Sequence, residues 1–251
     1  MVWRLIIDTG RDPYWNMAID EALLILRENG LIHNTLRIYW FKPSSVTIGY
    51  FQKVSDSVDE DYASTLGVPY TRRITGGGSV YHDENGELTY SVIASLNDFP
   101  RDPIERYRVI CSGLVRAIEY FGLRGEFKPI NDVLINNKKV SGSAQTWRKN
   151  AFLQHGTFMY NTDLDKLAHV LKAPKEKLSS RGLVSIKERV TTISIELGRI
   201  VTRDEALKAL IEGFKNALNV DFQEDSLSSL ENRYAEELVN KYRSLEWIRR
   251  K

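Results

Sequence analysis

The sequence predicts an α+β fold in which a mixed β-sheet is flanked by helices and a helical segment closes the chain. Two observations carry this prediction. Short runs rich in β-branched and aromatic residues, bounded by turn residues, recur over the first 160 residues. Longer segments with apolar residues at helical spacing lie between and after these runs, and a polar, helical-looking stretch occupies residues 226–247.

Proline and glycine residues bound most elements of the first half. Residues 1–8 read as a strand, and the turn at residues 12–13 leads into a helix that Gly30 ends. A second helix spans residues 103–121, from a proline in its first turn to the glycine that follows it. Three further strands are expected, over residues 36–40, 46–50 and 88–93.

In the second half, a strand is expected over residues 152–160 and a helix over residues 164–172. Another helix should span residues 204–218, because residues 202–205 have the Thr-x-x-Glu pattern of a capping box. No repeat or low-complexity segment interrupts the chain. We therefore expect residues 1–251 to form one domain without an accessory C-terminal domain, helical from about residue 200 onward.

Length, charge and cysteine content exclude several classes. The 251 residues suffice for a full core, and 42% hydrophobic with 27% charged residues is ordinary for a globular protein. A formal net charge of +2 gives no reason to expect a nucleic-acid partner. No apolar run approaches the roughly 20 residues that span a bilayer, so no membrane partner is expected. A single cysteine cannot form an internal disulfide, which favours a cytoplasmic location.

The most informative stretch is the glycine loop, residues 76–78, with the residues around it. Three consecutive glycines expose backbone N–H groups and let a ligand approach the main chain. Arg72 and Arg73 precede the loop with forked donors that suit phosphate or carboxylate oxygens. Such a triplet also occurs in simple tight turns, and adjacent arginines are common on surfaces. Together they predict a pocket for a phosphorylated or carboxylated small molecule.

Other known glycine-loop chemistries do not fit. No Gly-Lys-Ser/Thr follows as in a P-loop, and no G-x-G-x-x-G marks a dinucleotide site. His82 and Asp83 raise the idea of a metal, but the remaining histidines lack helical ligand spacing: His33, His155 and His169. His155, beside a glycine, is either a hydrogen-bonded strand residue or a ligand contact.

A second region of interest is a predicted hairpin, residues 133–140, with two lysines just after its turn. Asn136 and Asn137 separate two β-rich runs, and asparagine tolerates the positive φ of a two-residue type I′ turn. In that register Lys139 pairs with Leu134 and shares a face with Ser141. Lysines near hairpin turns often only increase solubility. The small residues that follow Lys139 leave room for a ligand, so we expect it to complete the anion site.

The only cysteine, Cys111, lies within the helix expected over residues 103–121. A free cysteine on the apolar face of a helix is typically a buried structural residue. We therefore expect Cys111 to have no catalytic role.

These motifs resemble the lipoate–protein ligase A family, within the superfamily of biotin/lipoate ligases and octanoyltransferases. The resemblance runs essentially from end to end and is strongest where the arginine–glycine loop combines with the lysine–serine–glycine motif. The matching segments occur in the family order: residues 16–23, 46–52, 72–83, 131–132, 138–144, 155–157, 241–242 and 246–247.

The resemblance implies a biotin/lipoate ligase type of catalytic domain and a two-step reaction. Lipoate and MgATP form lipoyl-AMP, and the lipoyl group then passes to a lysine of an acceptor protein. The implied acceptors are lipoyl domains of 2-oxoacid dehydrogenase complexes or the glycine cleavage H protein. Lipoate and octanoate are alternative acyl groups, and biotin fits the motif less well.

The resemblance also implies roles for individual residues. Lys139 matches the essential lysine, which bridges the lipoyl carbonyl and the α-phosphate. Asp132 matches an acidic residue near Mg²⁺ or the phosphates, Tyr81 would pack near the adenine, and His82 would line the lipoyl pocket. The implied ATP and lipoyl-AMP site comprises Arg72, Arg73, Gly76, Gly77, Gly78, Ser79, Val80, Tyr81, His82, Asp132 and Lys139.

The chain departs from the larger ligases because it ends shortly after Trp247, where they have an additional C-terminal domain. In this respect it resembles the catalytic subunit of two-part ligases, which need a separate accessory subunit for adenylation. Octanoyltransferases of the superfamily use a cysteine thioester and an acyl-carrier donor, and no cysteine lies near Asn131 or after His155. The alternatives are therefore an acyl-carrier-dependent transferase or a non-catalytic homologue that binds lipoyl domains.

Overall fold

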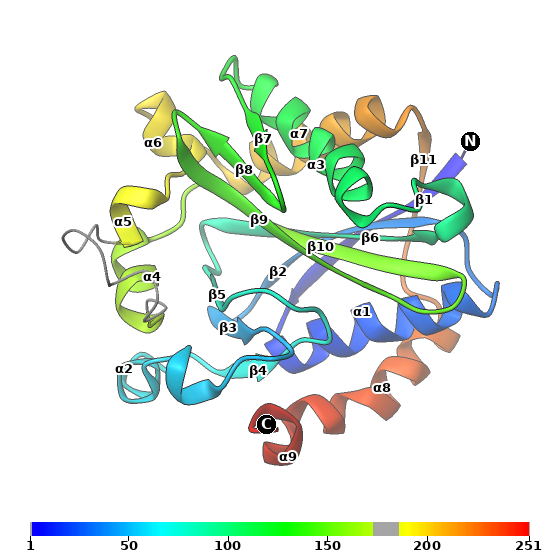
Figure 1. The fold of residues 1–251 in the computed structure, drawn as a ribbon, viewed down its shortest axis with the longest axis horizontal. Coiled ribbons are helices and arrows are strands. Elements are labelled where there is room, and N and C mark those ends of the chain that lie inside the picture. The colour runs from blue at the N-terminus through cyan, green and yellow to red at the C-terminus, as the bar shows by residue number, and fades with distance from the viewer. Residues whose placement is uncertain (1, 173–185, 251) are drawn as a thin grey trace.

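A mixed eight-stranded sheet is the centre of the computed structural model, which describes residues 2–172 and 186–250. The strand order is β11-β1-β2-β6-β10-β9-β8-β7 (Figure 1). Strand β1 pairs in parallel with both β2 and β11, and the other neighbours are antiparallel. The strands are β1 Val2–Arg11, β2 Thr35–Phe41, β6 Glu87–Ser95, β7 Glu126–Lys128, β8 Asp132–Ile135, β9 Lys138–Trp147, β10 Ala151–Met159 and β11 Asp221–Asp225.

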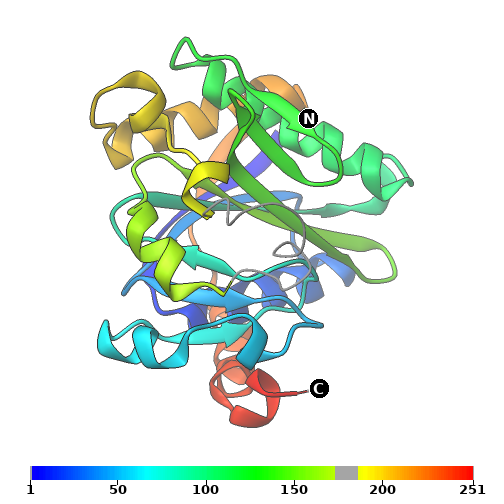
Figure 2. The same ribbon diagram turned by 60° about the vertical axis from the view of Figure 1, so that its left-hand side comes forward.

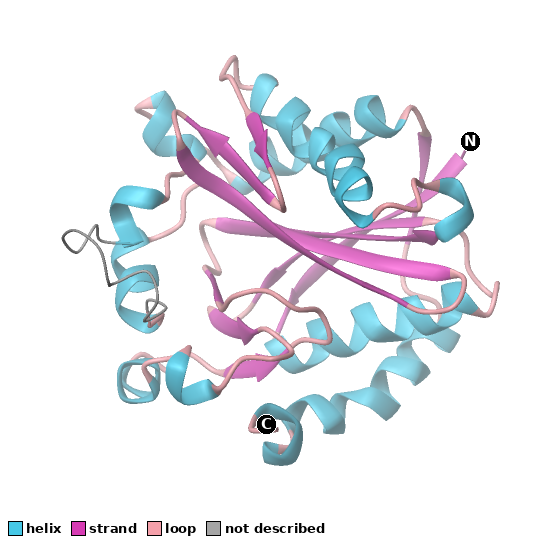
Figure 3. Cartoon of the chain, viewed as in Figure 1, coloured by secondary structure: helices cyan, strands magenta, loops and turns pink. Residues whose placement is uncertain are grey.

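Helices cover both faces of this sheet (Figure 3). Helices α3 (Pro103–Glu119) and α7 (Arg203–Leu218) pack together on one face, and α1 (Pro13–Glu28) packs with α8 (Ser229–Arg243) on the other (Figure 1). The shorter helices are α2 Glu60–Thr65, α4 Leu164–Val170, α5 Ile186–Arg189, α6 Ile193–Leu197 and α9 Leu245–Ile248, and the 3₁₀ turns are Val54–Asp56 and Leu96–Asp98. The resulting α+β architecture, a mixed sheet flanked by helices, is the predicted fold class.

A second, three-stranded sheet positions the glycine loop. It has the order β4-β3-β5, with β3 at Ser45–Ile48, β4 at Tyr70–Arg72 and β5 at Val80–His82. The glycine loop connects β4 to β5. The small sheet contacts α1, α8 and α9, and β9 and β10 pass above it in both views (Figures 1 and 2). Folding thus brings the glycine loop opposite the lysine hairpin.

Local sequence signals placed most elements correctly. Thr202 and Glu205 form the predicted capping box at the start of α7, and Asn136 and Asn137 have the predicted positive φ values of 50° and 63°. The helical prediction from residue 200 onward missed β11. That strand is exposed along most of its length and carries one apolar residue, Phe222, so it lacks the alternation that marks a half-buried strand. Among the described helices, none combines the length and apolarity needed to cross a membrane.

Candidate active site

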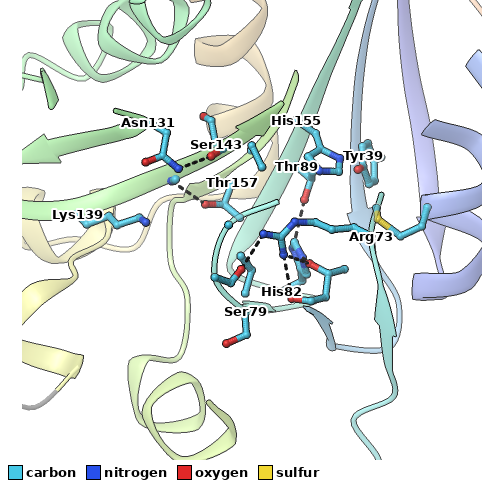
Figure 4. Close-up of a pocket in the computed structure, with 18 residues that line it drawn as sticks. Tyr39, Arg73, Ser79, His82, Thr89, Asn131, Lys139, Ser143, His155 and Thr157 are labelled. Atoms are coloured by element: carbon cyan, nitrogen blue, oxygen red, sulfur yellow. Dashed lines mark hydrogen bonds between the residues drawn. The ribbon is translucent and has the colours of Figure 1, made fainter. Parts of the chain in front are cut away.

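A pocket that is partly open to solvent lies between the glycine loop and the strands β9 and β10. Figure 4 shows Arg73, Ser79 and His82 on one side of this pocket and Asn131 and Lys139 on the other. Seven elements of the chain contribute to its lining, together with the loops beside them: Met17, Tyr39, Thr47, Arg73, Gly77, Gly78, Ser79, Val80, His82, Thr89, Asn131, Lys139, Gly142, Ser143, Ala144, His155, Gly156 and Thr157.

Arg73 braces the glycine loop from within the protein. Its Nη2 donates to the carbonyl oxygens of Gly76 and Gly78 at 2.6 and 2.7 Å, and Nε donates to Thr75 Oγ1 at 2.9 Å. Gly77 has a φ of +91°, which glycine adopts without strain. Burial lowers the pKa of Arg73 to about 10, and no carboxylate among the described residues forms an ion pair with it. The positive charge beside the loop is therefore available to an anionic ligand.

Arg72, also predicted to bind the ligand, lies outside the pocket. Its Nη1 donates to the carbonyl oxygens of Gly49 and Gln52 at 2.9 and 2.7 Å, and Nη2 donates to those of Ile248 and Arg250 at 2.7 and 3.1 Å. Its donors are thus committed to main-chain oxygens. Arg72 ties the C-terminal turn to the segment beneath the glycine loop and has no free donor to offer a phosphate.

Tyr81 also differs from the prediction. Its side chain is 2% exposed and belongs to the hydrophobic core, whereas its neighbours Val80 and His82 line the pocket. Adjacent residues of a strand face opposite ways, so the phenol cannot pack against a ligand in this pocket. His82 lies in the pocket wall. Its ring stacks on Phe41 with centroids 3.8 Å apart, and its Nε2 lies 3.0 Å from Thr47 Oγ1.

The opposite wall carries an ion pair between Lys139 and Asp132. The Nζ atom lies 2.7 Å from Asp132 Oδ1, and the two side chains are 38% and 34% exposed. Gly142 makes this arrangement possible, because a Cβ at that position would lie 2.5 Å from Lys139 Nζ. The lysine is therefore held across the surface of β9, at the mouth of the pocket.

The predicted pairing of Lys139 with Leu134 is confirmed, but Lys139 does not share a face of the sheet with Ser141 as predicted. The register shifts between Val133 and Leu134. Val133 therefore pairs with Ser141, and β9 has one extra residue that pairs with none on β8. Beyond this bulge, each side chain of β9 faces the side of the sheet opposite to the one predicted, so Lys139 lies over Gly142. Ser141 is fully buried and is not part of the pocket lining.

Cys111 is buried behind the pocket wall, as predicted. Its Sγ lies 3.6 Å from Ser143 Oγ, and Ser143 lines the pocket while Cys111 does not. Burial raises the pKa of the thiol to about 11. A thiol with this pKa is almost entirely protonated at neutral pH, so it is unsuited to nucleophilic attack.

Metal binding has limited support from the geometry. Within residues 2–172 and 186–250, no three His, Cys, Asp or Glu side chains converge on one point. Asp132 supplies a single carboxylate, and that carboxylate already faces an ammonium group. This donor set suits an ion that arrives with a polyphosphate ligand better than a resident metal.

Several lining residues lie outside the set predicted to bind the ligand. His155, left open between two roles, lines the pocket at 5% exposure. Asn131 donates from Nδ2 to the carbonyl oxygen of Ser143 at 2.5 Å, which links the start of β8 to the pocket wall. Four others come from distant segments: Met17 and Thr47 lie in segments that match the family but were given no role, and Tyr39 and Thr89 carry no local signal. Only the fold brings these four to the site.

An arginine-braced glycine loop facing a lysine hairpin on a mixed sheet defines a protein of the enzyme superfamily that contains lipoate ligases and octanoyltransferases. Residues 12–215 match the family described as the lipoyl protein ligase A/B catalytic domain, and the chain belongs to that family. The family resemblance inferred from the motifs is thereby confirmed.

Relatives of similar length are named octanoyltransferase LipM. The protein from Brevibacillus brevis is 34% identical, and 98% of each chain is aligned. Those from Geobacillus kaustophilus and Bacillus subtilis are 35% and 33% identical, over 98% of this chain and 97% of theirs.

Solved structures with the same fold are named as ligases. A bi-partite lipoate protein ligase from Thermoplasma acidophilum, described with its E2 lipoyl domain, is 36% identical with a TM-score of 0.85, over 99% of this chain and 96% of that one. A lipoate-protein ligase A bound with ATP is 33% identical with a TM-score of 0.84, over 98% of both chains. The two sets of relatives thus carry two different activities.

Proposed function

We propose that this chain is a lipoate–protein ligase, which joins a lipoyl or octanoyl group to a lysine of an acceptor protein through an acyl adenylate. The observation that carries the proposal is the contrast between Cys111 and Lys139. The only thiol of the chain is buried outside the pocket with a raised pKa, whereas an ammonium group lies at the pocket mouth. This contrast supports acyl transfer without a cysteine thioester.

The proposed first step activates the acid. A carboxylate oxygen of lipoate attacks the α-phosphorus of ATP, and the bond to pyrophosphate breaks. In the second step the ε-amine of the acceptor lysine attacks the acyl carbon, the bond to AMP breaks with its electron pair, and the amine loses a proton. Negative charge grows on the acyl oxygen and the phosphate, which the ammonium of Lys139 would stabilise from one side of the pocket.

The opposite side would hold the nucleotide. In this proposal Arg73 holds Gly76, Gly77 and Gly78 in place, and the loop offers backbone N–H groups to phosphate oxygens, with Ser79 and Val80 beside it. His82 would contact the acyl chain. Mg²⁺ bound together with ATP would neutralise phosphate charge, and Asp132 is the carboxylate available to it.

The competing function is an octanoyltransferase with an acyl-carrier donor. It is favoured by the name that the relatives from Brevibacillus, Geobacillus and Bacillus share. Against it, a covalent acyl-enzyme needs an accessible thiolate, and Cys111 offers neither access nor a low pKa. We rank this function second for that reason.

The test uses an apo lipoyl domain as acceptor and mass spectrometry as readout. Three donors are compared: lipoate with MgATP, synthetic lipoyl-AMP, and octanoyl-acyl carrier protein. The proposal expects modification with lipoyl-AMP and none with the acyl carrier protein. Modification by the acyl carrier protein alone would overturn it, and no modification by any donor would favour a non-catalytic binding protein.

The partners follow from the same proposal. A lipoyl domain or the glycine cleavage H protein would present the acceptor lysine in the cytoplasm. The Thermoplasma ligase of 36% identity is bi-partite, which supports a separate accessory subunit here as well. We expect this chain alone to use lipoyl-AMP readily and free lipoate poorly. Full-speed formation of lipoyl-AMP without a partner would rule out the accessory subunit.

A further inference from the structure

A buried row of hydrogen bonds connects helix α1 to the glycine loop. Asp20 Oδ2 lies 2.9 Å from His155 Nδ1, and His155 Nε2 lies 2.7 Å from Thr75 Oγ1. Thr75 Oγ1 in turn lies 2.9 Å from Arg73 Nε. Each of the four residues is at most 5% exposed, so water does not compete for these contacts. Asp20 and Thr75 do not line the pocket, and the site chemistry described above does not use them.

Counting protons fixes the direction of each bond in the row. An arginine Nε–H can only donate, so Thr75 Oγ1 accepts from Arg73. The single hydroxyl proton of Thr75 is then free to donate to His155 Nε2. Because the Asp20 carboxylate can only accept, the ring carries a proton on Nδ1 and donates it there. When the ring is neutral, Nε2 accepts from Thr75 and every proton of the row has an acceptor.

The rest of the structure favours this state. Burial lowers the pKa of His155, which keeps the ring neutral. Asp20 is fixed by three further donors: Arg37 Nη1 at 2.9 Å, Tyr39 Oη at 2.9 Å and Ser91 Oγ at 2.8 Å. Although burial opposes ionisation of Asp20, the hydrogen bond from His155 and the charge of Arg37 lower its pKa. The carboxylate is a rigid anchor for the row.

At the other end of the row, the guanidinium of Arg73 connects Thr75 to the glycine loop. Thr75 accepts from Nε, while Nη2, on the same edge of the guanidinium, donates to the carbonyl oxygens of Gly76 and Gly78. A planar guanidinium cannot rotate at one of these donors without moving the other. The hydroxyl of Thr75 thus determines where the two loop carbonyls lie.

We propose that Thr75, anchored by His155 and Asp20, is a positioning residue that holds Arg73 and thereby the glycine loop in its ligand-binding conformation. The proposal concerns the loop itself, and its consequence for ATP and lipoyl-AMP rests on the proposed function. Loss of the hydroxyl should release the loop without removing any group that touches the ligand.

The experiment compares Thr75→Val, which keeps the side-chain shape, with Thr75→Ser, which keeps the hydroxyl. Hydrogen–deuterium exchange of the ligand-free protein is followed in the peptide covering residues 74–81. One neutral hydrogen bond corresponds to roughly a 3- to 10-fold change in an equilibrium. We expect loop exchange to accelerate by about this factor in Thr75→Val and to be unchanged in Thr75→Ser.

Peptides from β1 and α3 report whether Thr75→Val merely destabilises the whole protein. A second variant, His155→Gln, retains an acceptor for the Thr75 hydroxyl and should protect the loop better than His155→Leu does. Unchanged loop exchange in Thr75→Val, or equal acceleration in all peptides, would overturn the positioning role.

A parallel measurement separates this proposal from the proposed function. The KM for lipoyl-AMP, whose phosphate the loop would also hold, should rise by the same 3- to 10-fold in Thr75→Val, with kcat for transfer from lipoyl-AMP less affected. If the loop loosens as expected while wild-type protein uses neither ATP nor lipoyl-AMP, the positioning role stands and the ligase assignment fails.

Discussion

The two walls of the pocket are built in opposite ways. On the glycine wall, residues 73–82, Arg73 is 4% exposed and its donors end on main-chain and threonine oxygens. On the lysine wall, formed by Asp132, Lys139 and Gly142, one ion pair lies at more than one-third exposure. An exposed pair of this kind contributes about 1 kcal/mol or less to stability. The glycine wall is therefore pre-organised to bind a ligand, whereas Lys139 can be displaced with little loss of folding stability.

The comparison makes a strong prediction for the lysine wall, where substitution should affect rate and leave stability intact. Lys139→Ala should lower the rate of acyl transfer from lipoyl-AMP by about 10²–10³-fold, since it removes a charge that stabilises the transition state. Thermal unfolding should be nearly unchanged. Lys138→Ala, at the exposed neighbouring position, is the matched control and should retain full activity. A fully active Lys139→Ala variant would contradict the assignment of a catalytic role to Lys139.

Gly142→Ala tests whether the position of the lysine matters as much as its presence. The new methyl group would lie 2.5 Å from Lys139 Nζ, so the flexible ammonium must swing aside. Displacement of a catalytic group by about 1 Å can cost on the order of 10²-fold in rate. We expect a loss of this order in kcat with little change in thermal unfolding. Wild-type kcat would show that Lys139 acts from a different position.

The row of hydrogen bonds that supports the glycine wall, through His155, should instead respond through stability and pH. Because burial lowers the pKa of His155 below 6.5, the unfolded chain binds a proton more readily than the folded one. The free energy of unfolding should therefore fall as the pH drops below 6.5, by at most about 1.4 kcal/mol per pH unit for one proton. Denaturant titrations of wild type and His155→Gln should differ in this slope. Parallel curves for the two proteins would contradict the buried neutral histidine.

Much of this site was predictable because its signals are local. The Asn136–Asn137 turn sets the hairpin register, so the pairing of Lys139 with Leu134 could be derived from a few residues. The β-bulge beyond it could not, because the extra residue on β9 has no distinctive sequence. That single residue decides that Gly142, and not Ser141, lies beneath the lysine.

The adjacent arginines show the same limit. Arg72 and Arg73 are chemically identical, and the sequence gives no reason to separate them. In the fold they face opposite ways, and the partners that occupy Arg72 include carbonyl oxygens more than 170 residues away in the chain. Tyr81 was misassigned for a similar reason, since its burial depends on which face of β5 meets the core. Motifs predict which segments meet, and packing decides which side chains of each segment meet.

The central claim is that acyl transfer here proceeds without a cysteine, and Cys111→Ala tests it most directly. The measurement is the rate at which an apo lipoyl domain gains the lipoyl mass from lipoyl-AMP, for wild type and variant at equal concentration. Because the thiol is buried behind Ser143 with a pKa raised to about 11, we predict rates that agree within about twofold. Loss of transfer in a variant that remains folded would contradict the account and identify the chain as a thioester-forming transferase.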